Sequence, residues 1–222
     1  MELGGFMYKK TLTSVIFHNL RILDKVCPED TYIANYKWHW DKWGDEFFDQ
    51  YCLGFWWGSE HNPKNILEIG SRTGLSLCQL LSGCKNYEGK RVVCFDLWDD
   101  GLSNPELIKK YLNHLAIPIV PECYQGDSRI TVPEFKKTNK DKFDYILVDG
   151  GHSDETASVD LENVVDMVSK GGVIVFDDIS ATIESDGFDL KPTWERFKEK
   201  HLAEFNWQED KAAKGTAWAI KL

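Results

Sequence analysis

The chain has 222 residues, enough for one domain with a substantial core and one appended segment. Its 36 acidic and 26 basic residues give a net charge of −10, which argues against a nucleic-acid partner. No apolar run reaches membrane-spanning length, the start MELGGFMYKK has no signal-peptide pattern, and the six cysteines form no C-x-x-C pair, so we expect a cytoplasmic protein with reduced cysteines, no membrane contact and no zinc site.

Residues 1–62 are expected to form an N-terminal helical and aromatic-rich segment, a lid or an interface, ahead of a main domain at 63–222. Apolar residues at helical spacing behind Thr13 and Ser14 predict a helix over residues 11–27. Aromatic side chains then concentrate in residues 31–58, where packing in a core or an interface is the favoured role. The alternative role is substrate binding, for which the candidates are His39, Trp40, Asp41 and Trp43.

Residues 65–77, NILEIGSRTGLSL, have the pattern of a strand, a tight turn and the start of a helix. Gly70 and Gly74 let the backbone turn sharply and approach a ligand closely. The spacing is not G-x-G-x-x-G, and the carboxylate of Glu68 beside the turn would repel a phosphate and favour a cation. A nucleoside that carries ammonium and sulfonium groups therefore fits this turn better than NAD.

Strands and helices alternate along the rest of the chain, which predicts a parallel sheet. One helix is predicted to start at Asn104-Pro105-Glu106. The segments 205–208 and 215–222 are predicted to be two final strands joined by a polar loop. Four apolar residues mark the buried face of another helix that ends before Gly171: Leu161, Val164, Val165 and Val168.

Three acidic residues follow two neighbouring predicted strands. Asp149 comes after the apolar run 145–148, and Asp177 and Asp178 come at the end of the run 173–176. Parallel strands would bring all three to one carboxyl edge, where open sheets bind ligands. Carboxylates held close together repel one another unless a cation neutralises them, and oxygen ligands favour magnesium, with manganese or calcium as alternatives. The sequence therefore predicts a metal site formed by Asp149, Asp177 and Asp178.

Residues 65–180 resemble, in order, the class I S-adenosylmethionine-dependent methyltransferases. That resemblance implies a Rossmann-like, doubly wound α/β sheet, mostly parallel, with helices on both faces and a C-terminal antiparallel hairpin. It rests on residues 65–77, on RVVCFDLWDD, on QGDS, and on FDYILVDGGH and GGVIVFDDIS. The last two segments resemble the macrocin-type sugar O-methyltransferases in particular.

The resemblance also implies how S-adenosylmethionine is bound. Asp96 would bind the ribose hydroxyls, and Asp127 with the backbone near Ser128 would contact the adenine. The first loop and the strand before it would supply the remaining cofactor-binding residues: Glu68, Gly70, Ser71, Arg72, Thr73 and Gly74.

In the resembling subgroup, the acids bind a metal that chelates the hydroxyls of the substrate, and a histidine three residues after the first acid is the base. Asp149 and His152 occupy the two catalytic positions. The expected reaction is methyl transfer to a hydroxyl of a sugar or another hydroxylated small molecule. Related enzymes often self-associate, and the sequence leaves a homo-oligomer open.

Other interpretations of these residues stay open. Asp177 and Asp178 could form a strand-end turn with a helix cap, and His152 could make a structural contact near a helix start. The alternatives for the whole protein are a nucleotide-cofactor oxidoreductase and a non-catalytic nucleoside-binding module.

Overall fold

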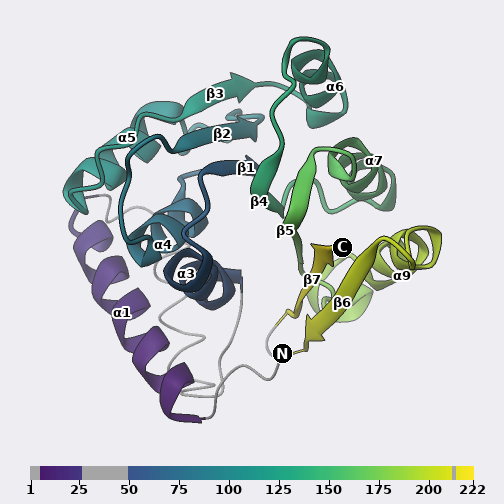
Figure 1. The fold of residues 1–222 in the computed structure, drawn as a ribbon, viewed down its shortest axis with the longest axis horizontal. Coiled ribbons are helices and arrows are strands. Elements are labelled where there is room, and N and C mark those ends of the chain that lie inside the picture. Colours follow the sequence, from purple (N-terminus) through teal and green to yellow (C-terminus); the bar gives the residue numbers. More distant parts are fainter. Residues whose placement is uncertain (1–5, 27–49, 212–213) are drawn as a thin grey trace.

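A computed structural model describes residues 6–26, 50–211 and 214–222 (Figure 1). The strands are β1 (Asn65–Ile69), β2 (Arg91–Asp96), β3 (Glu122–Gln125), β4 (Phe143–Val148), β5 (Val168–Asp177), β6 (Phe205–Asp210) and β7 (Thr216–Lys221). The helices are α1 (Phe6–Asp24), α3 (Gln50–His61), α4 (Leu75–Gly83), α5 (Pro105–His114), α6 (Ser128–Thr138), α7 (Asp154–Val164), α8 (Ile183–Asp186) and α9 (Lys191–Lys200).

The strands form one seven-stranded sheet in the order β3-β2-β1-β4-β5-β7-β6. The first five strands are parallel, and β7 pairs antiparallel with both β5 and β6. The chain order reverses between β1 and β4, where the register pairs Ile69 with Val148. This confirms the predicted sheet and C-terminal hairpin, and it places the ligand-binding switch point at the carboxyl ends of β1 and β4.

Helices cover both faces of the sheet (Figure 1). Helices α1, α3, α4 and α5 lie on one face, where Leu53, Trp57 and Tyr111 belong to one buried apolar cluster. Helices α6, α7 and α9 lie on the other face, where Leu161 and Trp194 belong to a second cluster. The central strands are buried on both sides, because each cluster packs against one face of the same sheet.

The N-terminal segment differs in detail from the prediction. Helix α1 begins at Phe6, so Thr13 and Ser14 lie inside it and do not cap it. Residues 6–12 contain no glycine or proline that would stop the helix from starting earlier. Trp56 and Trp57 of α3 are buried, and α3 packs on α4. The substrate-side candidates His39, Trp40, Asp41 and Trp43 lie outside the described residues.

Helix α5 starts as predicted, because the Asn104 side chain caps it by accepting a 2.9 Å hydrogen bond from the Leu107 amide. Helix α7 ends earlier than predicted, at Val164. Val168 already belongs to β5, where it pairs with Phe143. The apolar residues that seemed to mark one helix face are thus shared between the end of a helix and the start of a strand.

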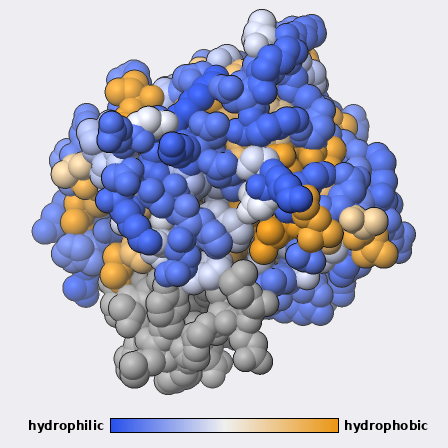
Figure 2. Space-filling view, viewed as in Figure 1, coloured by the Kyte–Doolittle hydropathy of each residue, from blue (hydrophilic) through white to orange (hydrophobic). Residues whose placement is uncertain are grey.

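Hydrophilic residues predominate on the face of the molecule shown in Figure 2, and hydrophobic residues appear there in separate groups. The large apolar side chains that stay exposed are scattered along the chain, for example Leu102, Val120 and Leu202. None of the helices described is long and apolar enough to span a membrane.

Candidate functional site

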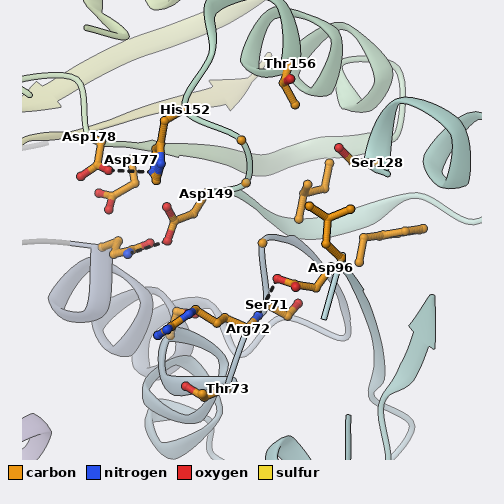
Figure 3. A pocket seen from close by; sticks show the side chains of 18 of the residues that line it. Ser71, Arg72, Thr73, Asp96, Ser128, Asp149, His152, Thr156, Asp177 and Asp178 are labelled. Carbon is orange, nitrogen blue, oxygen red and sulfur yellow. Dashed lines mark hydrogen bonds and ion pairs between the residues drawn. The ribbon is translucent and has the colours of Figure 1, made fainter. Parts of the chain in front are cut away.

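A cavity of about 540 Å³ opens at the carboxyl ends of the parallel strands. The loops that follow β1, β2, β3, β4 and β5 all contribute to its walls. Gln50 and Tyr51 of α3 and residues 214–216 at the start of β7 complete the lining. Most of the predicted site residues line it, in three groups (Figure 3): the loop after β1 with Asp96, the turn after β3, and the acids with His152.

The loop after β1 requires glycine at its first position. Gly70 has φ of +88°, and a Cβ placed there would lie 1.8 Å from the carbonyl oxygen of Asp149. Its amide donates a 2.8 Å hydrogen bond to the carbonyl of Phe95 in β2. The loop after β1 therefore presses directly against the loop after β4, an approach that a side chain would prevent.

The rest of this loop is divided between cavity and core. Ser71, Arg72 and Thr73 line the cavity, as the sequence predicts. Gly74 is absent from the cavity lining, and it caps the start of α4 with φ of +82°. A Cβ on Gly74 would meet the Ile108 side chain of α5 at 2.9 Å, so this glycine serves the packing of two helices.

Asp96 ends β2 and lines the cavity beside that loop. One carboxylate oxygen accepts a 2.8 Å hydrogen bond from the Arg72 amide, and the other accepts one of 2.8 Å from the Trp98 amide. The Trp98 indole donates to the Arg72 carbonyl at 2.9 Å, which ties the two loops together. Each carboxylate oxygen has a second lone pair, so Asp96 can still accept hydrogen bonds from a diol.

Asp127 and Ser128 follow β3 and also line the cavity. The Asp127 carboxylate caps α6 and forms a 2.6 Å ion pair with Arg129. The hydrogen bond from Arg129 lowers the pKa of Asp127, so this acid stays ionised.

Glu68 lies elsewhere than the sequence suggests. It is buried in β1 and is not among the residues that line the cavity. The Ser76 hydroxyl of α4 donates a hydrogen bond to it, and burial raises its pKa to about 8. Glu68 is therefore mostly protonated at neutral pH, behind the loop, and it does not present a charged carboxylate to a ligand.

Asp149, His152 and Asp178 form a compact group in which one potential ligand atom from each lies within 4.8 Å of the others. His152 Nε2 and Asp178 Oδ2 are 3.1 Å apart (Figure 3). Asp178 adopts φ of +64°, a conformation that is rare for residues other than glycine. Asp177 also lines the cavity, but its carboxylate accepts a 2.7 Å hydrogen bond from the Thr216 hydroxyl and stands outside the compact group.

The acids in this group are placed where a negative charge is costly. Burial, followed by repulsion from Asp178, raises the pKa of Asp149 to about 7. The hydrogen bond with Asp178 raises the pKa of His152. Two carboxylates and an imidazole at this spacing suit a divalent cation, because its charge would relieve the repulsion between the acids. The residues therefore fit a metal.

Several residues that line the cavity or contact its side chains were not found from the sequence. Gln50 donates a 2.9 Å hydrogen bond from Nε2 to Asp149, and Phe188 stacks on His152 with ring centroids 4.3 Å apart and planes 12° apart. Lys214 lines the cavity near the same group. These residues come from distant parts of the chain and carry no local motif, so no pattern in the sequence marks them.

A family model described as a methyltransferase domain matches residues 67–179, about half of the chain. No curated protein sequence matches this chain.

Solved structures share the fold at low sequence identity. The O-methyltransferase from Bacillus cereus in complex with S-adenosylhomocysteine is 18% identical, with a TM-score of 0.60 over 78% of this chain and 79% of that one. The O-methyltransferase TomG from Streptomyces achromogenes, in complex with S-adenosylmethionine, is 19% identical, with a TM-score of 0.62 over 78% and 79%. The TDP-rhamnose 3′-O-methyltransferase CalS11 of calicheamicin biosynthesis is 20% identical, with a TM-score of 0.55 over 76% of each chain.

Proposed function

Because this chain belongs to the methyltransferase-domain family, we propose that it is an S-adenosylmethionine-dependent O-methyltransferase that uses a divalent cation. One observation carries this proposal. The Asp149, His152 and Asp178 group lies in the same cavity as the loop after β1 and Asp96. A methyl donor bound by that loop and a hydroxyl held by that group would therefore meet inside one cavity.

The cofactor would occupy the half of the cavity bounded by the loops after β1, β2 and β3. Asp96 would accept hydrogen bonds from the ribose hydroxyls, and Ser71, Arg72 and Thr73 would line the path toward the sulfonium. Asp127 and Ser128 would contact the adenine. Structures with the same fold that hold S-adenosylmethionine or S-adenosylhomocysteine support this placement.

Magnesium or manganese would be held by Asp149 and Asp178, with His152 within reach of the same position. Asp177, which the sequence also assigns to the metal site, lines the cavity outside this group. Such an ion lowers the pKa of a coordinated hydroxyl and fixes its orientation. CalS11 acts on TDP-rhamnose, which supports a sugar or another molecule with neighbouring hydroxyls as the acceptor.

His152 is the proposed base. Its Nε2 faces Asp178, which would hold the proton on that nitrogen and leave Nδ1 to accept a proton from the acceptor hydroxyl. The acceptor oxygen then bonds to the methyl carbon as the carbon–sulfur bond breaks, which gives the methyl ether, S-adenosylhomocysteine and a proton on His152. The protein contributes mainly by holding the oxygen and the methyl carbon about 3 Å apart and in line.

Metal removal tests this function most sharply. Methyl transfer from labelled S-adenosylmethionine would be measured with a panel of sugars and catechols that carry neighbouring hydroxyls. EDTA should stop transfer and magnesium should restore it, whereas Asp149→Asn should not respond at ordinary magnesium concentrations. His152→Gln should lower turnover by about 2 to 4 decades while the affinity for S-adenosylhomocysteine stays the same.

Full activity after confirmed metal removal would refute the role of the cation. A His152→Gln variant that loses cofactor affinity or thermal stability in step with activity would show that the histidine is structural.

A further inference from the structure

Gln50 joins the N-terminal segment to the cluster of acids. It is the first residue of α3, and its Nε2 donates a 2.9 Å hydrogen bond to Oδ2 of Asp149, 99 residues further along the chain. Both residues line the cavity. Asp149, the first residue after β4, is therefore held by two contacts. Its amide bonds the backbone of β1, and its carboxylate bonds a side chain of α3.

This contact restricts the Asp149 carboxylate. The main chain is already fixed, because the Asp149 amide donates a 2.9 Å hydrogen bond to the carbonyl of Ile69. The carboxylate itself can rotate about its terminal bond unless a partner holds it. The Gln50 amide group engages Oδ2 and leaves the second oxygen available to a ligand. Partners of this kind typically change metal affinity by about 10- to 100-fold.

The other end of the same amide is unsatisfied. Gln50 Oε1 is buried and has no hydrogen-bond partner in the part of the chain that the structure describes. Buried polar atoms without a hydrogen-bond partner are uncommon in folded proteins, so each one needs an explanation. Because Nε2 is fixed on Asp149, Oε1 is fixed as well, as a buried acceptor for which the described residues supply no donor.

We propose that Gln50 is a positioning residue of the cation site: its Nε2 holds Asp149 in the orientation that binds the ion. This inference rests on the proposed function. It gives α3 a direct part in the site through Gln50.

Manganese binding tests the inference without an acceptor substrate. Free Mn²⁺ would be followed by electron paramagnetic resonance during titration of the full chain saturated with S-adenosylhomocysteine. Gln50→Met keeps the length of the side chain and removes both polar atoms, and Gln50→Ala is a second variant in case the first folds poorly. Gln79→Met is the matched control, because Gln79 is a buried amide of α4 that bonds Asn19 and is not among the cavity-lining residues.

Both Gln50 variants should bind Mn²⁺ about 10- to 100-fold more weakly than the wild type. Their affinity for S-adenosylhomocysteine should stay within about twofold, and Gln79→Met should bind Mn²⁺ as the wild type does. Wild-type Mn²⁺ affinity in the Gln50 variants would overturn the inference while leaving the proposed function standing. A wild type that binds S-adenosylhomocysteine but no Mn²⁺ would instead overturn the metal-dependent function, and this inference with it.

Discussion

At the residue scale, burial decides what each acid can do. Glu68 lies inside one buried apolar run and Asp149 directly follows another, and only Asp149 reaches the cavity. Glu68 lies within β1, where a side chain must point to one face of the sheet or the other. It points to the face covered by α4, where the Ser76 hydroxyl donates a hydrogen bond to it. Asp149 lies one residue past β4, where the chain leaves the sheet. The sequence places acids near an edge, but it does not tell an acid inside a strand from one beyond its end.

Glu68 gives the protein a predictable pH dependence of stability. Its folded pKa is raised to about 8 from 4.5, so the folded protein keeps a proton that the unfolded chain loses, and stability falls as the pH rises through that window. Thermal unfolding of the metal-free protein, measured at pH 5 and pH 8, should show Glu68→Gln close to the wild type at the lower pH and several degrees more stable at the higher. A difference that is the same at both pH values would show that Glu68 is ionised in the folded state.

At the element scale, the site depends on how closely the ends of neighbouring strands approach each other. The parallel pairing of β1, β2, β4 and β5 could be predicted, because each strand is a short apolar run that ends in glycine or aspartate. The start of α1 and the end of α7 could not be predicted, because the apolar spacing continues past the boundary in each case. Contacts between elements, such as Gly70 against Asp149, depend on tertiary packing that periodicity does not record.

Gly70→Ala tests this close approach. The added methyl group would overlap the Asp149 carbonyl, at a φ of +88° that alanine disfavours, so we expect a loss of about 3 kcal/mol or more in unfolding free energy and the loss of S-adenosylhomocysteine binding. Gly89→Ala is the control, since Gly89 has φ of +67° but nothing within 4 Å of its Cβ position, and it should cost only about 1 kcal/mol. Urea unfolding of both variants gives the comparison, and equal losses would mean that the contact with Asp149 carries no extra cost.

At the scale of the whole molecule, the sheet brings together residues that are far apart in the chain. Asp96, Asp149 and His152 could be predicted as site residues, because strand ends in a parallel sheet converge on one edge. Gln50 and Phe188 could not, because they reach the site from helices and loops whose position depends on the packing of the whole domain. The half of the cavity proposed to hold the nucleoside is thus better marked in the sequence than the half proposed to hold the acceptor.

Titration calorimetry with S-adenosylhomocysteine shows whether this cavity binds S-adenosylmethionine through Asp96. The wild type should bind one equivalent of S-adenosylhomocysteine and show no heat with NAD. Asp96→Ala should bind more weakly by about 2 to 3 kcal/mol, since two hydrogen bonds to the ribose are lost. Binding of NAD in place of S-adenosylhomocysteine, or unchanged affinity in Asp96→Ala, would contradict the account.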